Sequence, residues 1–406
     1  MRSFALAVVA ATLGLSACLG LSACSSSTHG DGSASQTPTH SATGTPSHSA
    51  SRTTPPPSSS TPPPTSTAQT VLAAMTENER IGQLFMVDCP TTSVADATVT
   101  AIKTYHVGSV ILDGTSQAGL AATQAVTAGL RALAPHGVGL FISTDQEGGL
   151  VQRLQGSGFD QIPSAVDQGA VDPAQLRAEA AGWGAQLRAA GVNVNLAPVL
   201  DTVPAGFGPN PPIGDLDREY GHDPATVTSH GIAVAQGMLQ AHVDPTVKHF
   251  PGLGRVTGNT DTTSGVTDDV TTRHDPYLAP FGAAVRDGFP FVMMSTAIYT
   301  KIDPNNPAAF SPTIVTSMLR GDLGFRGVIV SDDLGNAAQV SNYSIGARAV
   351  KFLDAGGTMV LTVDATQAAA MTAAVAAKAQ SDPAFRAKID QDALLVLQAK
   401  QARGLL

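Results

Sequence analysis

Eight short apolar runs alternate with Ala-rich stretches of helical character, and nearly every run ends on a charged or polar residue. This alternation predicts an α/β fold, a single (β/α)8 TIM barrel over residues 69–406. Apolar and polar positions do not alternate within the runs, which is typical of parallel strands covered on both faces. Because the carboxyl ends of barrel strands meet at one mouth, we expect the functional residues there.

The predicted strands cover residues 81–88, 107–113, 138–145, 192–201, 243–249, 291–296, 328–332 and 359–364. The predicted helices between them include 118–134, 173–190, 224–241, 278–287, 312–319 and 345–355. Two of these helices begin with Asp-Pro, at Asp172 and Asp223, so that Asp caps the helix and Pro occupies its first turn. The alternative fold is a doubly wound open sheet. No Gly-x-Gly-x-x-Gly follows the first predicted strand, which argues against the dinucleotide-binding form of that alternative.

The composition excludes several classes of protein. Of the 406 residues, 43% are hydrophobic and 14% are charged, which excludes a fully disordered chain and a protein with many membrane spans. The formal net charge of -9 argues against a nucleic-acid partner, because neutralising phosphates requires a basic face. Three cysteines, at positions 18, 24 and 89, are too few for a disulfide framework or a zinc cluster. We therefore expect no nucleic acid, no metal and no cofactor.

Residues 1–23 are typical of a bacterial lipoprotein signal peptide. A short apolar run follows Arg2, and Leu-Ser-Ala-Cys occurs twice, ending at Cys18 and at Cys24. In such signals the Cys becomes the lipidated first residue of the mature protein. We favour Cys24, because a Ser-rich segment begins directly after it; Cys18 and a plain secretory signal are the alternatives. Each of these places the mature protein outside the cytoplasm, either lipid-anchored to the cell membrane or secreted.

Residues 24–68 are expected to form a disordered tether. Ser, Thr and Pro occupy 31 of the 43 positions from 25 to 67. Such a segment buries too little apolar surface to offset the entropy cost of ordering it. The sequence thus predicts a signal peptide over 1–23, a tether over 24–68 and one folded domain over 69–406.

Four segments of the folded part carry residue types suited to catalysis. They are Ser143–Arg153 (STDQEGGLVQR), 193–201 (NVNLAPVLD) with 217–224 (DREYGHDP), Lys248–Gly254 (KHFPGLG) and Gly327–Leu334 (GVIVSDDL). Together, and in this order, they resemble glycoside hydrolase family 3, specifically its single-domain β-N-acetylhexosaminidase branch, over essentially all of residues 69–406. Too few residues follow Leu334 for the second sandwich domain of the larger β-glucosidase branch.

This resemblance implies a retaining cleavage of glycosidic bonds. In that reaction one carboxylate attacks the anomeric carbon, and a second group donates a proton to the leaving oxygen. The resemblance implies that Asp332, the first Asp of the SDDL motif, is the nucleophile, with Asp333 as a capping or orienting neighbour; the reverse assignment is the alternative. The residues implied for binding the hydroxyls of the terminal sugar are Asp145, Arg153, Arg218, Lys248 and His249. Because nearby cations lower the pKa of a carboxylate, we expect Lys248, Arg153 and Arg218 to keep Asp332 ionised.

The chain departs from the family in the loop that carries the acid/base catalyst. The family has Asp-Ser-His or Asp-Thr-His there, whereas this chain has Asp261-Thr-Thr, with Thr263 in place of the His. A threonine hydroxyl has a pKa far above the working pH and cannot serve as the acid. Three alternatives remain. Asp261 donates the proton itself, or another group nearby (Asp268, Asp269 or His274) donates it, or the protein binds glycans with little turnover.

These observations predict an exported, membrane-tethered retaining β-glycosidase. Localisation outside the cytoplasm favours cell-wall glycans or muropeptides as the substrate, and the family resemblance indicates terminal β-linked N-acetylglucosamine as the sugar. A glycan-binding lipoprotein without catalysis is the second hypothesis, and a β-glucosidase or phosphorylase of similar fold is the third. We expect a monomer that needs no cofactor. The remaining strand-end aspartates, Asp88, Asp113 and Asp364, are interpreted as helix caps.

Overall fold

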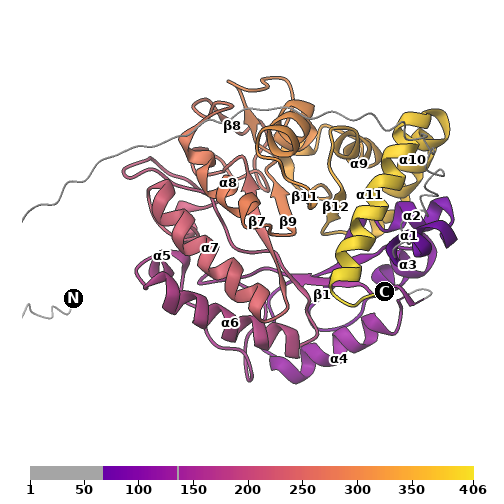
Figure 1. Cartoon of the computed structure of the whole chain (residues 1–406), viewed down its shortest axis with the longest axis horizontal. Coiled ribbons are helices and arrows are strands. Elements are labelled where there is room, and N and C mark those ends of the chain that lie inside the picture. Colours follow the sequence, from indigo (N-terminus) through magenta and orange to yellow (C-terminus); the bar gives the residue numbers. More distant parts are fainter. Residues whose placement is uncertain (1–66, 135–136) are drawn as a thin grey trace, which may run out of the picture. The chain divides into compact units, whose positions relative to one another are not determined.

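The computed structural model describes residues 67–134 and 137–406 (Figure 1). The predicted signal peptide, both candidate lipidation sites (Cys18 and Cys24) and the predicted tether up to residue 66 lie outside the described residues. Helix α1 (Thr67–Ala74) begins two residues before the expected domain boundary at 69. Its Ala68 is fully buried, and the Ala68 N–H donates to Oε1 of Gln401 at 2.8 Å, so the folded part includes these two residues.

Eight parallel strands close into a barrel in the order β1-β12-β11-β9-β7-β6-β3-β2. They are β1 (Phe85–Pro90), β2 (Ser109–Asp113), β3 (Phe141–Thr144), β6 (Val194–Asn195), β7 (Asp244–Phe250), β9 (Phe291–Met294), β11 (Val328–Asp333) and β12 (Met359–Thr362). One strand comes from each predicted apolar run, so the predicted (β/α)8 barrel is confirmed. The predicted start of the first strand at Ile81 is wrong. Ile81 lies in helix α2 (Glu77–Gly82), because Thr76 and Glu79 form a capping box that starts a helix there.

Helices surround the barrel (Figure 1). The α-helices that follow α2 are α3 (Asp96–Tyr105), α4 (Gly119–Arg131), α5 (Ala165–Gln168), α6 (Pro173–Ala189), α7 (Pro224–Gln240), α8 (Ala279–Arg286), α9 (Ile345–Asp354), α10 (Ala368–Ser381) and α11 (Pro383–Ala402). The 3₁₀ helices are η2 (Gly214–Leu216), η3 (Pro276–Leu278), η4 (Ala308–Phe310), η6 (Ala338–Val340) and η7 (Ala365–Gln367), and η5 (Thr313–Asp322) is a π-helix. As predicted, Asp172 and Asp223 cap α6 and α7, each accepting two main-chain N–H groups of the first turn. Within the described ranges, no helix is both long enough and apolar enough to cross a lipid bilayer.

The barrel end at the amino ends of the strands is closed by packed side chains. Phe141 and Phe291, the first residues of β3 and β9, meet edge to face with ring centroids 5.3 Å apart. Lys400 of α11 is buried over the Phe141 ring, and its Nζ donates to Oε1 of Gln83 at 2.6 Å and to the carbonyl of Gly108 at 2.8 Å. Burial lowers the pKa of Lys400 to about 7. A ligand must therefore approach from the opposite end, where the strands have their carboxyl ends.

Two small sheets shape the loops at this open end. Strands β4 (Gln146–Gly148) and β5 (Val151–Gln152) form an antiparallel hairpin directly after β3. Strand β8 (Thr267–Asp268) pairs in parallel with β10 (Ile298–Tyr299) and joins the segments that follow β7 and β9. Each strand of these sheets lies in the connection that follows a barrel strand, so the pairing gives the loops of the mouth a fixed backbone.

The strand-end aspartates interpreted as helix caps have three different roles. Asp364 caps η7 by accepting the N–H of Thr366 at 3.0 Å, as expected. Asp88 accepts the N–H of Ala365 at 2.5 Å and so binds the same helix from a neighbouring strand. The interpretation of Asp113 is wrong. The helix that follows it, α4, starts without a side-chain cap, and Asp113 instead lines the cavity described below.

Candidate active site

A cavity of about 390 Å³ opens at the carboxyl ends of the barrel strands. This volume is typical of small-ligand sites. The seven residues predicted for catalysis and sugar binding all line it: Asp145, Arg153, Arg218, Lys248, His249, Asp261 and Asp332. The fold therefore brings the four sequence segments together around one space.

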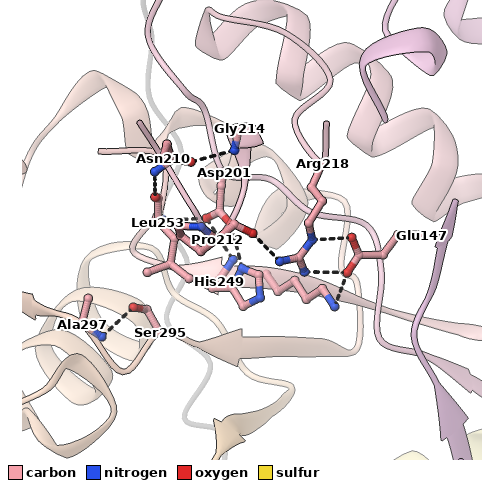
Figure 2. Close-up of polar contacts among 12 residues, drawn as sticks. Glu147, Asp201, Asn210, Pro212, Gly214, Arg218, His249, Leu253, Ser295 and Ala297 are labelled. Atoms are coloured by element: carbon pink, nitrogen blue, oxygen red, sulfur yellow. Dashed lines mark hydrogen bonds and ion pairs between the residues drawn. The ribbon is translucent and has the colours of Figure 1, made fainter. Parts of the chain in front are cut away.

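A buried ion network of Asp145, Glu147, Arg218 and Lys248 forms part of the cavity. Nζ of Lys248, on β7, lies 2.5 Å from Oδ1 of Asp145 and 2.6 Å from Oε1 of Glu147. Arg218 donates to both oxygens of Glu147, at 2.8 and 2.7 Å, and to the carbonyl of Pro212 at 2.6 Å (Figure 2). The two carboxylates thus take up the charge of the two cations. Nowhere in the described part of the chain are three or more His, Cys, Asp or Glu side chains placed to hold a metal ion.

Glu147 is the member of this network that the sequence analysis missed. Burial alone would raise the pKa of Glu147, but Arg218 and Lys248 outweigh burial and hold this pKa well below its ordinary range. The spacing of Glu147 from Asp145 could have indicated that it belongs to the site. Asp145 and Glu147 are alternate residues of an extended segment, and alternate residues of such a segment point the same way.

His249 is held in place by Asp201, the last residue of the predicted strand 192–201. Oδ2 of Asp201 accepts from Nδ1 of His249 at 2.6 Å, and Oδ1 accepts the main-chain N–H groups of His249 at 3.1 Å and Leu253 at 2.8 Å (Figure 2). Asp201 is fully buried, so the interaction is shielded from water. Among the described residues, Nε2 of His249 has no hydrogen-bond partner, which leaves it available to a ligand in the cavity.

The two aspartates of the SDDL motif have different surroundings. Asp333 accepts the N–H groups of Gly335 and Asn336 at 2.8 Å and of Val363 at 3.0 Å, and these bonds use both of its oxygens. Asp332 accepts the N–H of Asp333 at 2.9 Å through Oδ1 and lines the cavity. Asp333 therefore fixes the backbone, whereas Asp332 keeps its Oδ2 free of bonds to the described residues.

The expected direction of the pKa shift at Asp332 is wrong. Burial raises the pKa of Asp332 above its ordinary value, and His249 and Lys248 oppose this effect only in part. The carboxylate of Asp261 raises the pKa of Asp332 further. The reason lies in the ion network, where the charges of Lys248 and Arg218 are already compensated by carboxylates.

Comparisons with known proteins agree with this geometry. A family model described as "Glycosyl hydrolase family 3 N terminal domain" matches residues 76–398. The chain belongs to glycoside hydrolase family 3.

Its relatives narrow the class of enzyme. A β-N-acetylhexosaminidase from Beutenbergia cavernae DSM 12333 is 51% identical, with a TM-score of 0.80, over 81% of this chain and 99% of that chain. The β-hexosaminidase of Stenotrophomonas maltophilia (strain K279a) is 39% identical over 246 residues, which cover 58% of this chain and 70% of the relative. That of Xanthomonas campestris pv. campestris (strain B100) is 36% identical over 279 residues, 66% of this chain and 81% of the relative. The protein is a glycoside hydrolase of the β-N-acetylhexosaminidase-like type.

In this family 3 hydrolase, the loop after β7 places Asp261 at the cavity. Asn259, Thr260 and Asp261 line the cavity, whereas Thr263 is exposed and does not line it. Although Asp261 is exposed at the rim, the surrounding protein excludes enough water to raise its pKa, an effect that His249 opposes. A raised pKa is what a carboxylic acid requires in order to stay protonated and donate.

The other candidate proton donors lie elsewhere. Asp268 is fully buried and accepts two main-chain N–H groups of the turn that follows it. Asp269 and His274 are exposed, and none of the three lines the cavity. Of these candidates, only Asp261 lines the cavity.

Two further side chains complete the site. Arg153 lines the cavity, and its Nε is buried without a hydrogen-bond partner in the described structure. Asn210 donates to the carbonyls of Leu253 at 2.9 Å and Val256 at 2.8 Å and accepts the N–H of Gly214 at 2.8 Å (Figure 2). Asn210 thereby ties the segment that precedes Arg218 to the loop after β7. No pattern in the sequence indicates this role, because the partners of Asn210 are distant along the chain.

We expect Glu147→Gln to lower the free energy of unfolding by about 3–5 kcal/mol, because it leaves buried cations without their counter-charge. The folded-state pKa of Glu147 lies below its unfolded value, so this contribution is present above an unfolded pKa of about 4.3 and is lost as the pH falls through the folded pKa. Urea unfolding of wild type and variant should give a difference that is constant down to about pH 5 and shrinks in more acidic buffer. Glu179→Gln, which alters a carboxylate whose partner is the exposed Gln175, is the control. A difference that does not depend on pH would contradict this role of Glu147.

Proposed function

We propose that this family 3 glycoside hydrolase is an exported retaining β-N-acetylhexosaminidase. Its substrate would be terminal β-linked N-acetylglucosamine of cell-wall glycans or muropeptides. Its nucleophile would be Asp332. The observation that carries this proposal is the position of Asp332. Its carboxylate lines the same cavity as the ion network and His249, and the fold occupies only one of its oxygens among the described residues.

The reaction would proceed in two steps. In the first, Asp332 attacks the anomeric carbon, the bond to the leaving oxygen breaks, and that oxygen takes a proton from the acid catalyst. The sugar is then joined to Asp332 as a glycosyl ester. In the second step the former acid, now a base, takes a proton from water, and the water oxygen displaces Asp332 and restores the free carboxylate.

The ion network and its neighbours suit the binding of a neutral sugar. Lys248 and Arg218 are charge-compensated within the network, so they can share hydrogen bonds with hydroxyls without attracting an anion. Arg153 also lines the cavity and adds a guanidinium to its wall. His249, fixed through its Nδ1 by Asp201, adds Nε2. Such fixed charged and polar groups form strong, directional hydrogen bonds.

Asp261 is our candidate for the acid/base catalyst. It lines the cavity together with Asp332. Burial raises the pKa of both carboxylates; Asp261 raises the pKa of Asp332 further by like charge, and Asp333 does the same to Asp261. A donor that stays protonated near a carboxylate that attacks is the arrangement that glycoside cleavage requires.

The choice of sugar and location follows from separate observations. The relatives described above are named for hexosaminide cleavage, which supports N-acetylglucosamine as the terminal sugar. The signal-like sequence over 1–23, with its Cys24, supports export and a lipid anchor, and an exported hydrolase of this type has cell-wall glycans within reach.

A second candidate function is the binding of glycans with little turnover. The observation that favours it is the exposed Thr263 at the position where the family carries its acid/base His. Release of sugar from an activated aryl glycoside by the purified protein would exclude this candidate. Product analysis with and without phosphate in the same assay would separate a hydrolase from a phosphorylase.

Asp332→Ala should lower kcat for nitrophenyl N-acetyl-β-glucosaminide by about 10⁴-fold, because the side chain that would form the ester intermediate is then missing. Asp364→Asn, which alters a strand-end aspartate that caps η7, is the matched control and should keep the wild-type rate. Retention of wild-type turnover by Asp332→Ala would rule out this nucleophile.

Asp261→Asn should lower kcat/KM by about 10²–10⁴-fold for a substrate with a poor leaving group, because the leaving oxygen then lacks a proton donor. Dinitrophenyl glycosides need no protonation of the leaving oxygen, so their kcat/KM, which reports the first step, should stay close to the wild-type value. The exposed Asp269 provides the control variant Asp269→Asn. Equal losses on both substrates would show that Asp261 is not the acid.

Cys24→Ala should abolish labelling of the protein by radioactive palmitate in cells and shift it to the aqueous phase of a detergent partition. The reason is that the acyl chains that hold it at the membrane are attached to this residue. Cys18→Ala is the control and should remain labelled. Loss of the label in Cys18→Ala alone would move the lipidation site to Cys18.

A further inference from the structure

The loop that carries Asp261, residues 251–266, is fixed at its beginning by the side chains of Asp201 and Asn210. The N–H of Leu253 donates to Oδ1 of Asp201 at 2.8 Å. Asn210 donates to the carbonyls of Leu253 and Val256. Both fixing residues are fully or almost fully buried, so water does not compete with these bonds.

The rest of the loop is bound to helix η6, the short helix that follows the SDDL motif. The N–H of Ala338 donates to the carbonyl of Asp261, and the N–H of Gln339 donates to the carbonyl of Thr260, each at 3.0 Å. The side chain of Gln339 then binds both main-chain groups of Val266, accepting from its N–H at 2.8 Å and donating to its carbonyl at 3.1 Å. Gln339 is 5% exposed. A single residue therefore holds the loop on both sides of Asp261.

Helix η6 is itself held on the framework of the nucleophile. Asp333, the neighbour of Asp332, accepts the N–H groups of Gly335 and Asn336. Arg348 of α9 donates to the carbonyls of Leu334 and Gly335. The segment from Asp332 to η6 is thus bound to the barrel wall, and Gln339 connects the Asp261 loop to it.

We propose that Gln339 is a positioning residue that sets the separation between Asp261 and Asp332 at the value that retaining cleavage requires. This inference rests on the proposed function, in which these two carboxylates are acid/base and nucleophile. Retaining glycosidases keep their two carboxyl groups about 5–5.5 Å apart, and a misplacement of about 1 Å costs on the order of 10²-fold in rate. In this chain the separation depends on two elements far apart in sequence, and Gln339 is the side chain that joins them.

The loop contacts also maintain the surroundings of Asp261. The charged and titratable groups that act on Asp261 come from four separate segments of the chain: Asp145, Arg218, His249, Asp332 and Asp333. If the loop loosens, water enters and the pKa of Asp261 falls toward its ordinary value. Asp261 then loses its proton, and with it the ability to act as acid, at a lower pH.

The test compares two variants of Gln339 in the full protein. Gln339→Leu keeps the size of the side chain and removes both bonds to Val266. Gln339→Glu keeps the acceptor for the Val266 N–H but places a second acceptor against the carbonyl. Gln186→Leu is the matched control, because Gln186 of α6 likewise accepts a main-chain N–H and donates across the chain, to Asp160, outside the cavity.

We expect Gln339→Leu to lower kcat/KM for the β-linked disaccharide of N-acetylglucosamine by about 10–100-fold and kcat/KM for the dinitrophenyl glycoside by less than about threefold. The basic limb of its kcat/KM profile should move to lower pH. Gln339→Glu should show the same difference between the two substrates to a smaller degree, and Gln186→Leu should match wild type. Melting temperatures of all variants check that each is folded. If Gln339→Leu is not folded, Gln339→Glu provides the test.

Two results would overturn this role. One is an unchanged rate on the disaccharide, and the other is an equal loss on both substrates with an unchanged pH profile, which a purely structural role would give. Asp332→Ala in the same assays separates this outcome from failure of the proposed function. If wild type cleaves neither substrate, or if Asp332→Ala keeps the activity, the proposed function and the role of Gln339 fail together.

Discussion

The buried carboxylate of Glu147 is the contact on which the rest of the site depends. It lies within hydrogen-bond distance of Lys248 and Arg218, two cations that would repel one another in a buried space without it. Those residues come from β7 and from the loop after η2, while Glu147 comes from the hairpin after β3. One ion network thus gathers three distant segments of the chain. It also leaves the cavity with paired charges, which suits a sugar that carries hydroxyls and no net charge.

Neighbouring residues in the sequence have different surroundings in the site. Asp333 uses its carboxylate to fix the backbone, while Asp332 turns toward the cavity. In β7, the adjacent residues Lys248 and His249 each have a buried acidic partner, Glu147 and Asp201 respectively. Both side chains are therefore oriented before any ligand binds. Preorganised groups of this kind lose little freedom on binding.

The fold and most of the site could be predicted from sequence, because both depend on patterns among residues close together in the chain. Strands buried on both faces appear as apolar runs, and the residues that end them necessarily meet at the mouth of the barrel. Ile81 shows the limit of that reasoning, since an apolar residue beside a capping box belongs to a helix. Direct contacts between distant segments are not preceded by any such local pattern in the sequence. Asn210 and Gln339 are ordinary polar residues until the fold shows that each binds the loop after β7. The pKa of Asp332 likewise depends on which cations already have partners.

Helix α1 shows that the ends of the barrel serve different purposes. Ala68 packs with Val138, which precedes β3, and with Leu397 of α11, whose Lys400 fills the closed end. Helix α1 therefore covers the barrel at the end remote from the cavity, and none of its residues lines that cavity. Substitutions in α1 can change the stability of the barrel without touching the groups that meet a ligand.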